Sequence, residues 1–454
     1  MASRAHPVLP CLDAIEPERQ PPALVSELLE EIFLRVASSA DLARASGACV
    51  SFRRLIADHS FLCRYRSIHP PLLLGLVIHP WPRRVTGDVS EQQFDGTLGA
   101  GEANPSALAL CFLCFPGLTC LPRFHPVEAP HPSAAIARAV ALTADFSFDY
   151  LPCPTTERHY RSLCDIRDGR VLIEYDLREE NGLEYCDFVV CDPLSRRYVM
   201  LPRITDDLLA SVDLESQIIF NTGVSFIPSG GIEEDTSFSV IHWMQSDTTL
   251  GVFVFSSVSG CWSVSVSTNC NDLGLNELEL LVSGQCMYDC FYWKLYHMSM
   301  LIKLDMNTMQ FCIVDLPPGH DEREIVIVES GESKVAMFSL SYEGTSVDYY
   351  TFSQNGSDKS HEWHMMRTIP LPAHYTIMCY IGCYPAEGYI LIECVQDGEG
   401  PYYSTVFSLE VKSFNIERVR GTSHNGLAYP YFGFPPSMSP RRIQGYGEVC
   451  LFSP

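Results

Sequence analysis

The sequence predicts a small all-α N-terminal segment followed by a large all-β domain, in the arrangement of a kelch-like β-propeller. Three observations lead to this fold class. Helical periodicity is concentrated in residues 23–67. From about residue 70 the chain consists of short β-rich runs separated by Gly, Asn, Asp and Pro, as in strands and turns. Pairs of such runs recur roughly every 50 residues, which is the spacing of kelch-type propeller blades.

Composition divides the chain into three parts. Residues 1–22 are rich in proline and lack apolar periodicity, which predicts a flexible tail. Residues 23–69 form the helical segment and residues 70–454 the β-rich domain, with two prolines at the boundary. Residues 1–70 are electrically neutral, so the net charge of −24 lies in the β-rich domain. The 46% apolar and 19% charged residues are typical of a folded globular protein.

Two amphipathic helical regions are expected in the helical segment. Five apolar residues share one face of the first helix: Val25, Leu28, Leu29, Ile32 and Val36. A second helical region covers residues 41–58, and Gly47 is expected to break or kink it. Beyond residue 70, residues 133–145 are the one further stretch that predicts a helix.

Five hairpin-like segments share a plan in which a strand ends in an acidic or polar residue and a short turn leads into a second strand. The turns are predicted at or near Asp192, Ser256, Asp305, Ser353 and Glu410. Residues 72–430 have room for roughly six or seven blades of about 55 residues. One small sheet cannot bury both of its faces alone, whereas a ring of sheets can. A pair of β-sandwiches is the alternative, because the same alternation of strands and turns would also fit that fold.

The helical segment resembles a known family. The stretch PALVSELLEEIFLRVASSADLARASGACVSFRRLIADHSFL is similar to an F-box, the short helical module that docks substrate receptors onto a Skp-type adaptor in cullin ubiquitin ligases. The following RYRSIHPPLLLG resembles the junction found in a large group of grass F-box proteins. The segments PAHY, YFGFPPSMSP and LPPGHDER resemble the β-propeller domain of that group. The resemblance implies a receptor that binds the adaptor, and through it a cullin, and holds an unidentified target protein on its β domain.

The resemblance also implies an adaptor-binding surface, position by position. Leu24 and Val25 match the opening Leu-Pro pair of the family, with Val25 in place of Pro, which loosens the start of the first helix. Phe52 stands where Trp is usual, which removes an indole N–H, and Gly47 replaces a usual apolar residue. The implied adaptor-contacting residues are Leu24, Val25, Leu28, Leu29, Ile32, Phe33, Leu42, Cys49, Phe52 and Leu55.

The sequence predicts an intracellular protein that acts in the cytoplasm, the nucleus or both. The N-terminal stretch has no apolar core of the length of a signal peptide. The longest apolar runs, residues 72–78 and 107–115, are too short to cross a membrane. The 19 cysteines are then expected to be mostly reduced thiols. An acidic chain of this kind is not built to bind the phosphate backbone of nucleic acids.

No catalytic residue, metal or cofactor is predicted. The cysteines and histidine of C-x2-C-x5-C-x4-H at residues 111–125 are possible zinc ligands. However, the first pair lies in a strand-like run, where residues three apart point to opposite faces. His361 and His364 are also three apart in a strand-like context, unlike the paired histidines of a metalloprotease helix. Two alternative functions remain, namely a carbohydrate-active β-propeller enzyme and an interaction scaffold without ligase activity.

Overall fold

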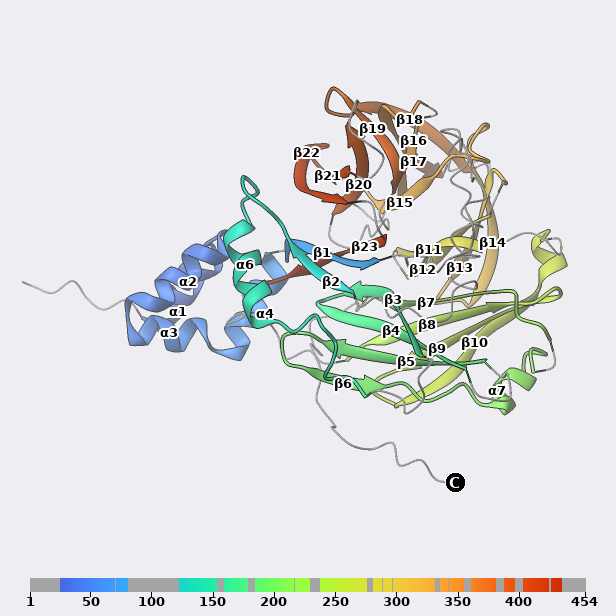
Figure 1. Ribbon diagram of the computed structural model, residues 1–454, viewed down its shortest axis with the longest axis horizontal. Coiled ribbons are helices and arrows are strands. Elements are labelled where there is room, and N and C mark those ends of the chain that lie inside the picture. Colours follow the sequence, from blue (N-terminus) through green and yellow to red (C-terminus); the bar gives the residue numbers. More distant parts are fainter. Residues whose placement is uncertain are drawn as a thin grey trace, which may run out of the picture. The chain divides into compact units, whose positions relative to one another are not determined.

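In a computed structural model of the protein, the chain forms two compact units, Met1–Ile68 and His69–Pro454. Figure 1 shows the helices of the first and the strands of the second. Each unit is described by itself. The described residues are 25–69, 71–80, 122–152, 159–178, 184–215, 217–228, 237–275, 281–287, 289–295, 297–330, 335–341, 343–354, 361–380, 388–396, 403–423 and 426–434.

Residues 25–68 of the helical unit form four helices. They are α1 (Ser26–Leu34), α2 (Ser39–Ala48), α3 (Val50–Ile56) and α4 (His59–Ile68). The apolar core of the unit draws on all four, with Phe33, Leu42, Ile56, Phe61 and Tyr65 buried. The Phe33 ring meets the ring of Phe52 edge to face, with centroids 5.0 Å apart, so α1 packs on α3.

The second helical region is broken at Cys49, not at Gly47 as the sequence predicted. Gly47 lies inside α2, whereas Cys49 has an extended backbone with φ −155° and ψ 163°. The Cys49 Sγ accepts a hydrogen bond from the Phe52 amide at 3.4 Å and so caps α3. A helix tolerates an internal glycine at a cost of about 1 kcal/mol. A side chain that satisfies the first amides of the next helix favours the break at its own position.

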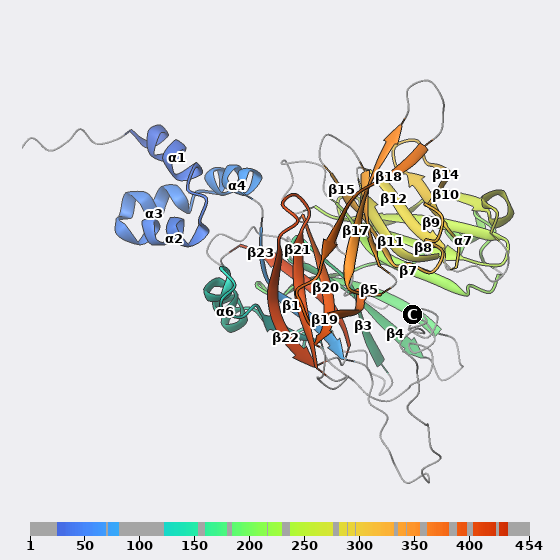
Figure 2. The same ribbon diagram turned by 90° about the horizontal axis from the view of Figure 1, so that it is seen from above.

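The β unit is a six-bladed β-propeller (Figures 1 and 2), which confirms the predicted propeller, though not its kelch-like character, and shows that the β-sandwich alternative was wrong. Blade 1 consists of β3 (His159–Arg167), β4 (Arg170–Arg178), β5 (Glu184–Asp192) and β6 (Arg197–Met200). Blade 2 consists of β7 (Asn221–Ile227), β8 (Ser239–Gln245), β9 (Thr249–Ser256) and β10 (Cys261–Asn269). Blade 3 consists of β11 (Leu281–Met287), β12 (Cys290–Leu295), β13 (Met300–Asp305) and β14 (Gln310–Asp315).

The remaining blades complete the ring. Blade 4 consists of β15 (Ile325–Glu329), β16 (Val335–Leu340), β17 (Ser346–Gln354) and β18 (His361–Pro370). Blade 5 consists of β19 (Tyr375–Tyr380), β20 (Tyr389–Gln396), β21 (Tyr403–Glu410) and β22 (Ile416–Ser423). Blade 6 has three strands in the described part of the chain, β23 (Gly426–Gly433), β1 (Leu72–Pro80) and β2 (Arg123–Pro126). All pairings within the blades are antiparallel, and each of the first five blades is a run of four consecutive strands.

Blade 6 closes the ring by pairing strands from the two ends of the propeller sequence. β1 and β23 run antiparallel, from Leu72 opposite Gly433 to Pro80 opposite Gly426. The Tyr429 hydroxyl on β23 then donates to the Leu163 carbonyl on β3 at 2.6 Å, which joins blade 6 to blade 1. Strand pairing within blade 6 thus joins the two ends of the propeller sequence, and the hydrogen bond from Tyr429 joins that blade to blade 1.

In the described part of the β unit, three helices accompany the blades. They are α6 (Ala134–Thr143), α7 (Asp206–Ala210) and the 3-10 helix η1 (Cys270–Leu273). α6 confirms the helix predicted over residues 133–145, and it packs on β1 and β2 through buried Ala137 and Val140. α7 and η1 were not predicted, because helices this short carry no periodic signal. No helix in the described ranges is long and apolar enough to cross a lipid bilayer.

Four of the five predicted hairpin turns share one geometry. In each, the amide four residues after the strand end donates to the carbonyl of the strand-end residue at 2.8 Å. The donor–acceptor pairs are Arg196–Asp192, Gly260–Ser256, Met309–Asp305 and Phe414–Glu410. All four donors have left-handed φ angles, from 54° to 70°. The fifth turn, near Ser353, follows β17 and falls on residues outside the described ranges.

The strand-end side chain explains why acidic residues precede these turns. The Oδ1 atom of Asp192 accepts a hydrogen bond from the Leu194 amide at 2.9 Å. The Oδ1 atom of Asp305 accepts from the amides of Asn307 and Thr308 at 2.9 and 3.0 Å. These bonds, that from Thr308 above all, hold the pKa of the Asp305 carboxyl below its usual value. The side chains thus satisfy amides that the turn leaves unpaired.

Two Gly→Ala substitutions are expected to change stability in opposite directions. At Gly260 (φ +70°) a Cβ would meet no other atom within 4 Å, so the left-handed backbone alone should lower stability by about 1–2 kcal/mol. At Gly47, inside α2 and equally open, alanine should raise stability by about 1 kcal/mol. Denaturant unfolding followed by tryptophan fluorescence reports the β unit, which holds all five tryptophans, and ellipticity at 222 nm reports the helices. A Gly260→Ala variant as stable as the unmodified protein would contradict the turn geometry.

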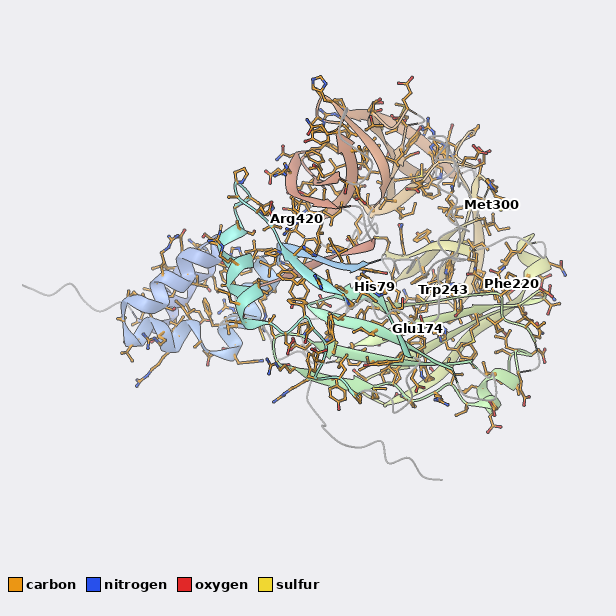
Figure 3. The ribbon with its side chains drawn as sticks, viewed as in Figure 1. His79, Glu174, Phe220, Trp243, Met300 and Arg420 are labelled. Carbon is orange, nitrogen blue, oxygen red and sulfur yellow. The ribbon has the colours of Figure 1, made fainter. Side chains whose placement is uncertain are left out.

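Apolar side chains fill the spaces between neighbouring blades. Between blades 2 and 3, the Trp243 ring (Figure 3) lies 5.5 Å from the ring of Phe291 and 5.8 Å from that of Trp293, measured between centroids. A Cβ on Gly223 would come within 2.0 Å of the Trp243 ring, so only glycine fits beneath this indole. Trp293 is 0% exposed. The blades are thus joined by large buried aromatic side chains, each of which contributes strongly to stability.

Candidate functional site

The outer face of α1 is an apolar surface without a covering element in the described structure. Val25, Leu28 and Ile32 are 57%, 53% and 48% exposed. Their spacing of three and four residues places them within about 60° of one another around the helix. We refer to these three residues as the α1 apolar face. A surface helix ordinarily carries polar residues on its solvent side, so three neighbouring exposed apolar side chains indicate a protein-binding surface.

The inner side of α1 is buried in the core of the helical unit. Phe33 and Leu34 are 6% and 3% exposed. Leu29 is half-buried between the two sides. The same helix therefore has one apolar side in the core and a second apolar side in solvent. Only the first is explained by folding of the unit itself.

α4 holds α1 by contacts that do not use the α1 apolar face. The Arg64 guanidinium pairs with Glu30 at 2.6 Å and with Glu31 at 2.8 Å. These pairs are exposed, so they orient α1 more than they stabilise it. The buried Tyr65 hydroxyl donates to the Val36 carbonyl, just after α1, at 2.8 Å. Burial raises the pKa of Tyr65 to about 12, so this donor keeps its proton at neutral pH.

The ten residues that the F-box resemblance implied fall into four groups. The exposed ones are Val25, Leu28, Ile32 and Cys49. The half-buried ones are Leu29, Phe52 and Leu55. The buried ones are Phe33 and Leu42, at 6% and 0% exposure. Leu24 lies outside the described residues. In this structure Phe33 and Leu42 belong to the core of the helical unit, so their side chains support the surface and do not form it.

Two exposed apolar residues of the helical unit, Val50 and Ile68, were missed by the sequence reasoning. Ile68 is 57% exposed at the last position of α4. Val50 is 61% exposed at the first position of α3, directly after the capping Cys49. The signal that could have found it is its place at a helix start, where a side chain has no preceding turn to pack on. Helical periodicity does not identify such a residue, because the residues three and four positions before it are not part of the same helix.

The structure describes only some of the residues weighed as possible metal ligands. Among the residues that the structure describes, no group of three or more His, Cys, Asp or Glu side chains could hold a metal ion. Of the C-x2-C-x5-C-x4-H segment, His125 lies on β2, while its cysteines, Cys111, Cys114 and Cys120, lie outside the described residues. His361 and His364 lie on β18, which is the strand context that the sequence predicted.

A fully buried carboxylate in the propeller has a structural role. Asp165 on β3 is 1% exposed. Its oxygens accept hydrogen bonds from the amides of Ile166 and Phe226 and from the Ser225 hydroxyl, at 2.7 to 2.8 Å. Since Ser225 and Phe226 belong to blade 2, this carboxylate joins blade 1 to blade 2.

Comparison with protein-family models matches residues 162–396, slightly more than half of the chain, to the family described as F-box protein AT5G49610-like, beta-propeller. The matched region runs from β3 in blade 1 to the end of β20 in blade 5. A search among curated proteins found no match.

Solved structures with similar folds are only distantly similar. A prolyl endopeptidase matches with a TM-score of 0.34 and 9% identity over 59% of this chain and 35% of its own, about a third of its length. The WD40 domain of SCAP from fission yeast matches with a TM-score of 0.29 and 12% identity, over 62% and 74% of the two chains. A DUF4221 family member from Bacteroides vulgatus matches with a TM-score of 0.32 and 11% identity, over 63% and 90%. Likeness at this level carries no argument about function.

Proposed function

This chain belongs to the F-box protein AT5G49610-like β-propeller family, and from that premise we propose that it is the substrate-recognition subunit of a Skp–cullin–F-box ubiquitin ligase. The α1 apolar face docks a Skp-type adaptor, which connects the chain to a cullin. The propeller binds a target protein. The chain catalyses no reaction itself. It raises the effective concentration of target lysines near the ubiquitin-carrying enzyme. Its place of action is the cytoplasm, the nucleus or both, and its grass-type character is part of the proposal.

The exposure of Val25, Leu28 and Ile32 is the observation that carries this proposal. Fully burying a side chain of this size contributes about 1.5–3 kcal/mol. Because each is about half exposed, covering all three contributes about 3 kcal/mol. That is the scale of a binding hot spot, which is an apolar cluster surrounded by polar residues. Glu27 and Glu31, exposed on the same helix, supply part of such a polar rim.

Leu28→Asp is expected to weaken adaptor binding by about 30-fold or more, which corresponds to about 2 kcal/mol. The new carboxylate would be desolvated beneath the adaptor without a partner. Titration of the full-length protein with a purified Skp-type adaptor measures the effect. Leu142→Asp is the matched control, because Leu142 is an 83% exposed leucine on α6, in the other unit. It should bind the adaptor as tightly as the unmodified protein does.

A second variant separates binding from folding. Leu42→Asp, at a 0% exposed position, should unfold the helical unit and lose ellipticity at 222 nm, whereas Leu28→Asp should keep it. If Leu28→Asp binds the adaptor normally, the α1 apolar face is not the docking surface. If the unmodified protein does not bind any Skp-type adaptor, the ligase function fails, and a propeller enzyme or a scaffold without ligase activity takes its place.

A further inference from the structure

Cys63 on α4 has two basic side chains against its sulfur. The Arg66 Nη2 atom donates to the Cys63 Sγ at 3.4 Å. The His59 ring nitrogens lie 3.7 and 3.8 Å from the same sulfur. The three residues follow one another at i, i+4 and i+7, so they share one side of α4. The thiol is half-buried, and small molecules can reach it.

Six other described cysteines are buried or lie beside a carboxylate. Five are buried: Cys191, Cys270, Cys286, Cys290 and Cys394. Burial raises the pKa of Cys286 and of Cys394 to about 12, which suppresses their thiolate forms. Cys164 is half-buried, with its sulfur 4.0 Å from a Glu174 carboxylate oxygen, which also disfavours a thiolate.

Two exposed cysteines have neutral hydrogen-bond partners. Cys49 Sγ accepts from the Phe52 amide, and Cys261 Sγ donates to the Ser259 hydroxyl at 3.3 Å. Cys312 on β14 is also exposed, but it lies opposite Lys303 of β13 and is not an uncharged reference. Cys49 and Cys261 therefore serve as internal references for the effect of charge on reactivity.

The carboxylates nearest to α4 in sequence or by contact are engaged elsewhere. Asp58, just before the helix, accepts hydrogen bonds from Ser60 and from the Phe61 amide. Glu30 and Glu31 on α1 pair with Arg64. The Arg66 guanidinium and the His59 imidazole both contact the Cys63 sulfur. A guanidinium beside a thiol favours the thiolate, and the thiolate is the nucleophile in disulfide exchange.

We propose that Cys63 is a site of reversible mixed-disulfide modification by small anionic disulfides of the oxidised-glutathione type. The Cys63 thiolate attacks one sulfur of the disulfide, forming a new S–S bond to that half of the molecule. The old S–S bond breaks, and the other half leaves as a thiolate that takes a proton from water. Arg66 and His59 stand beside the sulfur, where they attract the carboxylates of the incoming molecule. This inference does not depend on the ligase role.

The test compares two aliphatic disulfides of opposite charge on the full-length protein. Oxidised glutathione is anionic and cystamine is cationic. The adduct at each cysteine is followed in time by peptide mass spectrometry. With oxidised glutathione, Cys63 should react about fivefold or more faster than Cys261, since one nearby charge contributes about that factor. With cystamine this preference should shrink, because Arg66 repels the cation.

Variants at Arg66 assign the effect to its charge. Arg66→Gln should remove most of the preference of Cys63 for oxidised glutathione over cystamine, and Arg66→Lys should keep it. Arg53→Gln, which removes an exposed arginine from α3, is the matched control and should leave the preference unchanged. The proposal is overturned if Cys63 in the unmodified protein reacts with oxidised glutathione no faster than Cys261. It is also overturned if Arg66→Gln, with native ellipticity, leaves the preference intact.

Discussion

Replacing Asp165 with alanine is expected to lower the free energy of unfolding of the propeller by about 3–5 kcal/mol. The Oδ2 atom of Asp165, on blade 1, accepts from the Phe226 amide and the Ser225 hydroxyl of blade 2, both at 2.8 Å. Its Oδ1 atom accepts from the Ile166 amide at 2.7 Å. The substitution leaves these donors without an acceptor, and each buried donor left unpaired costs about 1–3 kcal/mol.

Desolvation of the carboxyl reduces this loss only in part. Burial raises the pKa of Asp165, while the Arg167 charge and the hydrogen bond from Phe226 oppose the rise. The alanine variant no longer has to bury a carboxyl group, which offsets some of the broken bonds. The net effect is therefore smaller than three full hydrogen bonds but remains among the largest for a single side chain in this fold.

Denaturant unfolding followed by tryptophan fluorescence measures the effect. Ser225→Ala removes one of the three donors and should cost about 1 kcal/mol. Gln285→Ala provides a parallel case, because the Gln285 Oε1 on blade 3 accepts from the Ile327 amide on blade 4 at 2.8 Å, and its expected cost is about 1–3 kcal/mol. A loss below 1 kcal/mol for Asp165→Ala would show that this carboxylate does not hold blades 1 and 2 together.

Acidification is expected to destabilise the propeller through His242, by about 2 kcal/mol at pH 5 and about 3 kcal/mol near pH 4. His242 on β8 is 5% exposed, and burial lowers its pKa from 6.5 to about 4. The folded state therefore keeps the ring neutral where the unfolded chain binds a proton. The stabilising contribution is fully present above pH 6.5 and is lost as the pH falls from 6.5 toward 4.

The hydrogen bonds around His242 explain why it resists protonation. The Thr222 hydroxyl donates its proton to the Trp243 carbonyl at 3.0 Å. The 2.8 Å contact between Thr222 Oγ1 and His242 Nε2 must then be a hydrogen bond that Nε2–H donates. Nδ1 is buried and has no hydrogen-bond partner in the structure. A proton on Nδ1 would place a charged donor in the core without an acceptor.

A His242→Gln variant isolates this contribution, because the glutamine amide can donate to Thr222 and does not titrate. The expected result is a flatter dependence of stability on pH between 6.5 and 4, whatever the stability at neutral pH. His125, His131 and His320 also have pKa values lowered by burial and add to the acid loss in both proteins. The raised pKa of Asp165 acts in the opposite sense in both. Identical slopes for the two proteins would contradict the role of His242.

Local features of this protein were predictable from the sequence because they depend on residues close together in the chain. The periodicity of residues 133–145 predicted α6. The polar strand ends at Asp192, Ser256, Asp305 and Glu410 predicted turns that the structure has at those positions. The break between α2 and α3 was predicted in the correct region but at the wrong residue. Either Gly47 or a cap at Cys49 could end α2. The hydrogen bond from the Phe52 amide to the Cys49 sulfur places the break at Cys49.

The candidate site was predictable only in part. The apolar pattern of α1 includes Phe33, which is buried, and Leu28, which is exposed, and the two are chemically alike. Periodicity shows which residues share a face but not whether another element covers that face. The cluster of Cys63, His59 and Arg66 could have been found from its helical spacing, once α4 was recognised as a helix.

By itself the sequence determined the strands, the turns, the periodic helices and the number of blades to within one, since hydrogen bonding and side-chain alternation act over a few residues. Only the tertiary structure decided how the ring closes, because β1 and β23 pair across more than 340 residues of chain. It also decided the donors to Asp165 and the isolation of His242. The burial and the pKa of a side chain depend on which groups the fold places beside it. These groups can be far away in the sequence, so a local sequence pattern does not show them.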